Sequence, residues 1–151
     1  MIPWVDVIIV ALSIAGLADA LYFTFAYYGR IKKARWIPKI LCAREGSSCV
    51  TVVQTPYARV LGVPNSLLGI LYYLAIMAWI PWSNTRHGAG PGTREFMIFT
   101  AALLFASGGS VVMGFYLIHS LRRKLHIDCP LCYTAHAINL ILFILLVVYY
   151  P

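Results

Sequence analysis

Four long apolar runs dominate this sequence of 151 residues and limit what it can fold into. They cover residues 4–28, 64–82, 95–121 and 128–150. Each is close to or above the roughly 20 helical residues that cross a hydrocarbon core. Charged residues make up 11% of the chain, whereas soluble domains carry about 25%, so a soluble globule is excluded. The sequence predicts an all-α protein of one membrane domain, in which four transmembrane helices form an up-down bundle with both termini on one side.

The ends of these runs carry signals that stop a helix. We expect Pro81 and the Gly-rich stretch 88–92 to end the second helix, and the basic residues 122–124 to end the third. The N-terminus has no basic region, and its apolar run is longer than the core of a cleaved signal peptide. We therefore expect the first run to be retained as a membrane helix.

A long loop, residues 29–63, joins the first two predicted helices and carries a cysteine pair. Basic and apolar residues interleave over 31–41, a pattern typical of a segment at the membrane interface. Cys42 and Cys49 then flank a short polar turn that contains Gly46 and two serines. Such a turn is flexible enough for the two cysteines to meet as a disulfide or to move apart.

A second cysteine pair, in Cys129-Pro130-Leu131-Cys132, opens the last apolar run. Proline suits the first turn of a helix, where the backbone donor that it lacks has no partner in any case. Cys129 is then expected at or beside the N-cap, and Cys132 in the first turn. There the unpaired amides and the positive end of the helix dipole favour a thiolate, so this pair is predicted to be redox-active.

Polar residues inside the predicted helices are candidates for the interior of the bundle. His136 and Asn139 share a helical face with Cys132, and their positions fit either packing or contact with a ligand. Asp19 lies well inside the first helix, where a structural hydrogen bond to another helix is favoured over a role in proton handling. The small residues Ala106, Ser110 and Gly114 recur every four positions, which predicts a face for close helix packing.

Three interpretations of the four cysteines compete. A zinc site is disfavoured because Cys42 and Cys49 are further apart than the two to four residues usual in zinc knuckles. Two structural disulfides are possible, although a Cys-Pro-x-Cys at a helix start favours a reactive link. In the third interpretation the pairs form an electron relay by thiol–disulfide exchange, because an even number of spans places both on the same side of the membrane.

Together these residues resemble the vitamin K epoxide reductase family of quinone-linked thiol oxidoreductases. The similar features follow one another along nearly the whole chain. They are the loop pair Cys42 and Cys49, the hydroxyl residue Thr55, the stretch 60–69 with Pro64 and Asn65 leading to Tyr72 and Tyr73, and the Cys-Pro-Leu-Cys at 129–132.

The resemblance implies a route for electrons. A reduced thioredoxin-like protein would pass them to Cys42, Cys49 would exchange with Cys129, and Cys132 would reduce a quinone inside the bundle. Many bacterial members carry a thioredoxin domain after a fifth span. The sequence given has none, so a separate thioredoxin-like partner is expected.

The resemblance also implies a set of site residues. Family members hold the quinone head through polar side chains near the start of the second helix and on the fourth. Asn65 and His136 stand at those places, and Asn139 lies on the same face as His136. Thr55 stands where serine is commoner and Asp19 has no role given by the family; both are kept as supporting residues.

The expected activity is therefore oxidation of a thioredoxin-like protein coupled to reduction of a ubiquinone- or menaquinone-type acceptor, without a metal, to promote disulfide formation. One alternative is the net reductive direction, with vitamin K epoxide or a quinone as substrate. Another is a four-helix membrane scaffold that is not an enzyme and whose cysteines are structural or bind zinc.

The distribution of basic residues predicts the orientation in the cell membrane. Of the 12 Lys and Arg residues, all but Arg86 and Arg94 lie on the side that carries the cysteines. Short loops rich in Lys and Arg stay in the cytoplasm, so the cysteine side is predicted to face the cytoplasm. This placement also explains the net charge of +7 without invoking nucleic acid.

Overall fold

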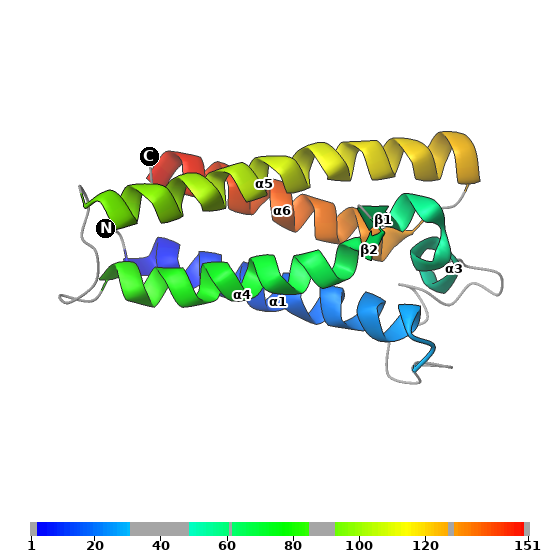
Figure 1. Cartoon of the computed structure of the whole chain (residues 1–151), viewed down its shortest axis with the longest axis horizontal. Coiled ribbons are helices and arrows are strands. Elements are labelled where there is room, and N and C mark those ends of the chain that lie inside the picture. The colour runs from blue at the N-terminus through cyan, green and yellow to red at the C-terminus, as the bar shows by residue number, and fades with distance from the viewer. Residues whose placement is uncertain (1–2, 31–48, 61, 85–92, 127–128, 150–151) are drawn as a thin grey trace.

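The structure, a computed structural model, describes residues 3–30, 49–60, 62–84, 93–126 and 129–149. Its main feature is a bundle of four long helices, each long and apolar enough to cross a membrane. The four are α1 (Pro3–Tyr27), α4 (Asn65–Asn84), α5 (Arg94–Ser120) and α6 (Pro130–Tyr149). They run alongside one another, with the start of α1 and the end of α6 at the same end (Figure 1). The predicted all-α four-helix membrane bundle is confirmed.

Local sequence explains how α5 starts. Its N-cap is Thr93, whose side-chain oxygen accepts a hydrogen bond of 3.3 Å from the backbone N–H of Phe96. Glu95 places a negative charge in the first turn, which suits the positive end of the helix dipole. These polar contacts satisfy the first turn of a helix whose remaining surface is largely apolar.

The expectation that Pro81 ends the second helix is wrong, because Pro81 lies inside α4, which continues to Asn84. Proline removes one backbone hydrogen bond, to the carbonyl four residues earlier. The loss is tolerable here because only one turn follows. The hydroxyl of Ser83 also donates a 2.8 Å hydrogen bond to the carbonyl of Ile80, which satisfies an acceptor near the helix end.

The α-helical part of α5 ends at Ser120, but the basic residues 122–124 do not leave the helix at once. They lie in a wider π-helical turn, η2 (Leu121–Leu125). His126 ends that turn in the left-handed conformation with φ of 53°, and its N–H bonds to the carbonyl of Leu121. The chain then turns back into α6.

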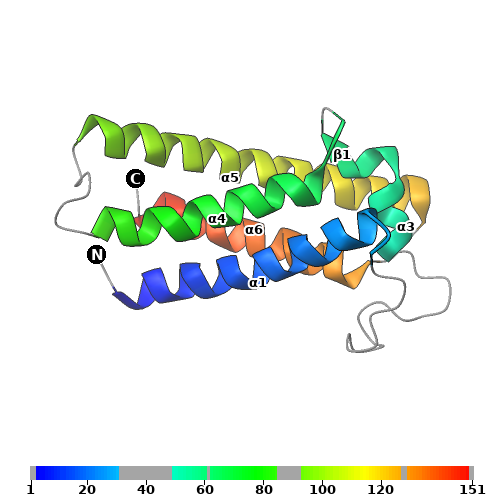
Figure 2. The same cartoon turned by 60° about the horizontal axis from the view of Figure 1, so that its bottom comes forward.

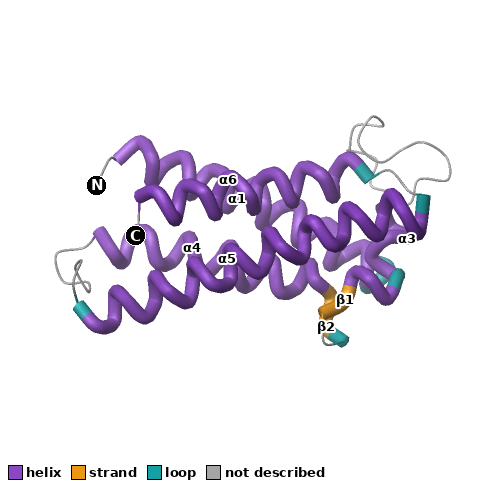
Figure 3. The backbone as a smooth tube through the Cα atoms, turned by 90° about the horizontal axis from the view of Figure 1, so that it is seen from above, coloured by secondary structure: helices purple, strands orange, loops and turns teal. Residues whose placement is uncertain are grey.

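Short elements that begin at Cys49 form a cap on one end of the bundle. They are the helix α3 (Cys49–Gln54), the 3₁₀ turn η1 (Pro56–Ala58) and the antiparallel strands β1 (Arg59–Val60) and β2 (Val63–Pro64). Gly62, with φ of 85°, supplies the turn between the strands. Figures 2 and 3 place this cap at the end of the bundle opposite the chain termini. Residues 31–48, including Cys42, lie outside the described part.

Two groups of buried side chains hold the bundle together. We call the larger one, toward the termini, the packed core; it consists of Val5, Ile9, Ala20, Tyr73, Ile76, Trp79, Ile80, Phe96, Leu103, Ile138, Leu142 and Leu146. We call the smaller one, under the cap, the cysteine cluster; it consists of Phe23, Ala26, Val52, Val53, Leu121, Cys129 and Cys132. Helix α1 packs against both α4 and α6, and α5 packs against α6.

Candidate functional site

A cavity of about 660 Å³ lies inside the cysteine half of the bundle. All four long helices contribute to its wall, and the short elements after Cys49 add Val52, Val53, Ala58 and Val60. Most of the wall is apolar. Its polar side chains are few: Asp19, Asn65, Ser66, Tyr72, Tyr73, Ser110, Cys132, His136 and Asn139. A mainly apolar space of this size with a few polar groups is typical of a site for a small, largely apolar molecule.

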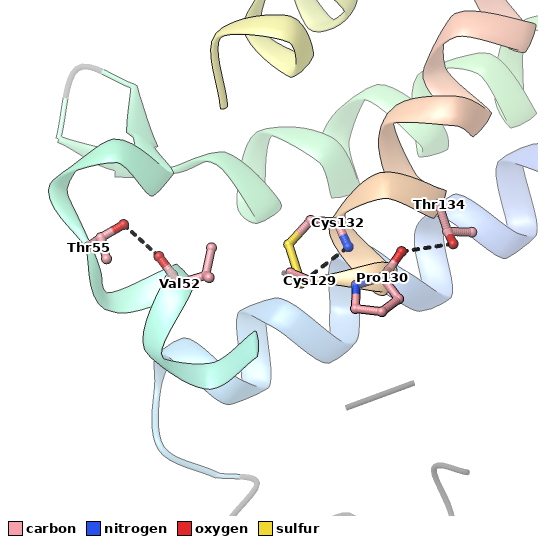
Figure 4. Close-up of a disulfide and its surroundings, with 6 residues drawn as sticks. All are labelled: Val52, Thr55, Cys129, Pro130, Cys132 and Thr134. Carbon is pink, nitrogen blue, oxygen red and sulfur yellow. Dashed lines mark hydrogen bonds between the residues drawn. A yellow bond between two sulfur atoms is a disulfide. The ribbon is translucent and has the colours of Figure 1, made fainter. Parts of the chain in front are cut away.

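The cysteine pair of α6 lies at one end of this cavity. Cys129 directly precedes Pro130, the first residue of α6, and the backbone N–H of Cys132 donates a 3.3 Å hydrogen bond to Cys129 Sγ. The two form a disulfide, with their Cα atoms 5.3 Å apart. Figure 4 shows this link beside the cap. Proline at the first helical position and a sulfur that caps the helix explain why the chain folds this way locally.

The two sulfurs of this disulfide differ in their surroundings. Cys132 forms part of the cavity wall. Cys129 is completely buried within the cysteine cluster, where Val52 and Val53 of α3 also pack. The disulfide therefore lies between the cavity on one side and the cap on the other.

Of the loop pair, Cys49 lies at the same end of the molecule as the α6 pair. Cys49 is the first residue of α3, about one helical turn before Val52, which packs in the cysteine cluster. Cys42 lies outside the described residues, so the pairing of Cys42 with Cys49 stays a prediction. The fold brings the start of α3 and the start of α6 together across the cysteine cluster.

Three residues expected to contact a ligand line the cavity. Asn65 is the first residue of α4; next to it, Ser66 Oγ lies 3.0 Å from Thr24 Oγ1 and ties the start of α4 to α1. His136 and Asn139 both lie on the cavity side of α6. The structure thus brings together polar groups from opposite sides of the bundle, although their roles stay predictions.

Asn139 is held by a partner that sequence analysis did not identify as part of the site. The hydroxyl of Tyr73 donates a 2.6 Å hydrogen bond to Asn139 Oδ1, so the amide Nδ2 takes no part in this bond. Tyr73 fits because Gly16 of α1 has no side chain: a Cβ there would lie 2.7 Å from the Tyr73 hydroxyl oxygen. The detectable signal was a tyrosine pair, Tyr72 and Tyr73, deep in an apolar run instead of at the membrane interface.

His136 is positioned by a glycine in the same way. A Cβ at Gly114 of α5 would lie 2.8 Å from His136 Nδ1. That nitrogen is buried and has no hydrogen-bond partner within the described part of the chain. The predicted small-residue face of α5 therefore does permit close approach at Gly114, but Ala106 and Ser110 on the same face line the cavity. Small residues on α5 thus also make room for the cavity.

Thr55 does not line the cavity. Its hydroxyl donates a 2.7 Å hydrogen bond to the carbonyl of Val52, at the end of α3 (Figure 4). Thr55 also precedes Pro56, where η1 starts. Its supporting function in this arrangement is to hold the turn between α3 and η1.

Within the described residues, which exclude Cys42, no three His, Cys, Asp or Glu side chains gather closely enough to hold a metal ion. A zinc site built from both cysteine pairs requires Cys42. The zinc alternative is therefore left to direct metal analysis.

A comparison with protein-family models matches this chain to a known family. The model described as "Vitamin K epoxide reductase family" matches residues 7–147, which include both cysteine pairs and all but the outermost residues of the four long helices. No curated protein matches the chain at a significant level.

Proposed function

Because the chain belongs to the vitamin K epoxide reductase family, whose members are quinone-reducing thiol oxidoreductases, we propose that it oxidises a separate thioredoxin-like protein and reduces a quinone in the cavity. The quinone is of the ubiquinone or menaquinone type. The net result is the formation of disulfides in other proteins.

One observation carries this proposal: Cys132 forms part of the wall of an apolar cavity that also contains Asn65, His136 and Asn139. The head of a quinone is a flat ring with two carbonyl acceptors, and it needs apolar walls and a few donors. The Nδ2 group of Asn139 is such a donor, because its Oδ1 is already engaged by Tyr73. The cavity volume of about 660 Å³ is also within the usual range for small-molecule sites.

Electrons pass from the loop pair to the α6 pair and then to the quinone. The dithiol of the partner attacks a Cys42–Cys49 disulfide and leaves as a disulfide, so the loop pair becomes a dithiol. Cys49 then exchanges with Cys129, which reduces the Cys129–Cys132 disulfide and oxidises the loop pair again. Cys132 passes two electrons to the quinone as the Cys129–Cys132 disulfide reforms. The two protons released by the thiols balance the two that a quinol gains.

Replacing Cys132 with alanine tests the relay. Quinone reduction by the purified protein, supplied with a reduced thioredoxin-like protein, is expected to fall to background in Cys132→Ala, with an unchanged helical spectrum. Thr134→Ala, an exposed change on the same turn of α6, is the matched control and is expected to keep full activity. Activity that survives in Cys132→Ala, or zinc bound at one equivalent per chain, would refute the relay.

We further propose that the cysteine end faces the cytoplasm. The exposed residues Arg123 at that end and Arg94 at the other supply matched sites for a topology test. Arg123→Cys and Arg94→Cys, each in a background whose native cysteines are serine, are treated in intact cells with an impermeant thiol reagent. Labelling of residue 94 alone is expected. Labelling of residue 123 alone would show that the cysteine end faces the outside of the cell.

A further inference from the structure

Asp19 is placed on the wall of the cavity by the face of α1 that points inward. That face consists of Gly16, Asp19, Ala20 and Phe23, which repeat at helical spacing and all line the cavity. The other described acidic residues, Asp6 and Glu95, lie in the first turns of their helices. Asp19 is thus the acid that the described structure presents to a ligand inside the bundle.

The surroundings of Asp19 favour its uncharged form. The described cavity wall contains no Lys or Arg, and Asp19 makes no hydrogen bond or ion pair with the described residues. The other titratable groups nearby are Tyr22 on α1, Tyr72 and Tyr73 on α4, and Cys132 and His136 on α6. An isolated carboxylate at such depth is costly, because no cation in the described cavity wall balances its charge.

Among the described residues, no neighbouring helix gives Asp19 the partner that a structural acid would have. In a membrane protein, a structural acid normally bonds a group on a neighbouring helix. Asp19 instead lies between two features of the site on one helical face. One turn earlier is Gly16, which makes room for Tyr73, the partner of Asn139. One turn later is Phe23, which packs in the cysteine cluster with Cys132.

We propose that Asp19 is a catalytic residue for the proposed quinone reduction, and that it donates one of the two protons that the quinone gains. When Cys132 transfers its electron pair, negative charge develops on a quinone oxygen. A neutral acid beside that oxygen neutralises the charge, because its O–H bond breaks as the new O–H bond forms. The carboxylate left behind then takes up one of the two protons released when the Cys129 and Cys132 thiols become a disulfide. The other proton goes to the second quinone oxygen, so atoms and electrons balance.

Tyr22 gives this proton a short way back. It lies three residues after Asp19, on the same side of α1 and within electrostatic range of the carboxyl group. It also packs against the cysteine cluster that contains Cys129. Tyr22 is thus near both the acid and the cluster that contains the sulfurs, and its hydroxyl is the group expected to return the proton.

This inference rests on the proposed function, and Asp19→Asn tests it separately. The variant keeps the size of the side chain but removes the acidic proton. Protein reduced at Cys129 and Cys132 is mixed with a short-chain ubiquinone analogue, and quinol formation is followed in a single turnover. We expect the rate of quinol formation to fall by about 100-fold or more, as is usual for loss of a general acid. The affinity for the quinone is expected to stay within about threefold of the parent value. Asp19→Glu is expected to restore most of the rate.

The pH profile separates chemistry from structure. In Asp19→Asn the proton has to come from solvent, so the residual rate is expected to fall about tenfold for each rise of one pH unit. Glu95→Gln, an exposed change in the first turn of α5, is the matched control and keeps the parent rate and profile. If the parent protein reduces no quinone, the proposed function itself fails. If it does, then a full rate in Asp19→Asn overturns the inference; so does a loss that comes only from weakened quinone affinity with an unchanged pH profile.

Discussion

The two halves of the bundle are built from the same four helices but are filled differently. Toward the termini, the packed core is closed by large side chains such as Ile9, Ile76, Leu142 and Leu146, which are almost completely buried. Toward the cysteines, glycine and alanine replace large residues on the inner faces, and a cavity of about 660 Å³ remains. The difference shows how one bundle separates its tasks: one half stabilises the helices, and the other keeps open a space that Cys132 reaches.

The largest expected effect comes from filling the cavity in the cysteine half of the bundle. Ala135 lies one turn after Cys132 and lines the cavity, so Ala135→Phe is expected to lower quinone reduction by about 100-fold, or about 2.7 kcal/mol. The reduced Cys129–Cys132 pair should still be oxidised at the parent rate by a small soluble oxidant such as diamide. Ala137→Phe, at an exposed position on the same helix, is the control. Equal loss in both variants would show that the cavity is not where the quinone is reduced.

Removing a large side chain from the packed core is expected to lower stability and to leave activity unchanged. Leu142 is completely buried in the packed core, and Leu142→Ala leaves a void whose cost is about 2 kcal/mol or more. Unfolding of the purified protein by increasing SDS measures this change. Quinone reduction per folded molecule should stay at the parent value. A selective loss of activity without destabilisation would mean that the two halves are not separate in function.

The boundary between the halves is tested at Gly16. Gly16→Ala places a methyl group against the ring of Tyr73, so Tyr73 has to move and its bond to Asn139 is lost. We expect the KM for quinone to rise about tenfold, which corresponds to about 1.4 kcal/mol. Gly108→Ala is the matched control, since its methyl group would meet Phe143 at an ordinary 3.6 Å. A parent-like KM in Gly16→Ala would show that Asn139 needs no support from Tyr73.

The smallest expected effect concerns the cap, which borders the cavity. The guanidinium of Arg59 lies 5.4 Å from the centre of the Tyr27 ring, and Lys124 contacts Tyr57 in a similar way. One exposed cation–π contact contributes about 0.5–1 kcal/mol to stability, which is lost when the cation is removed. Arg59→Ala is therefore expected to speed amide hydrogen exchange in α3 and η1 a few-fold, while exchange in the packed core does not change. Faster exchange throughout the bundle would mean that the cap and the core unfold together.

Part of the site could be predicted because it depends on neighbours in the chain. The placement of Cys129 before a proline at the helix start, and of Cys132 in the first turn, follows from local backbone chemistry. His136 and Asn139 share a face with Cys132 by helical spacing alone. In contrast, the short elements of the cap were not predicted, because a six-residue helix and two-residue strands carry too little periodic signal. Pro81 was misjudged because a proline near a helix end costs little.

The sequence by itself determined that four helices cross a membrane and to which family the chain belongs, and it predicts that both cysteine pairs lie on one side. The tertiary structure decided which face of each helix points inward. Phe105 is 86% exposed and Leu142 is fully buried, although both are large apolar residues. The physical reason is that lipid is as apolar as the protein interior, so a membrane helix needs no polar outer face and its sequence does not reveal its rotation. Only packing turns Gly16 toward Tyr73 and Asp19 toward the cavity.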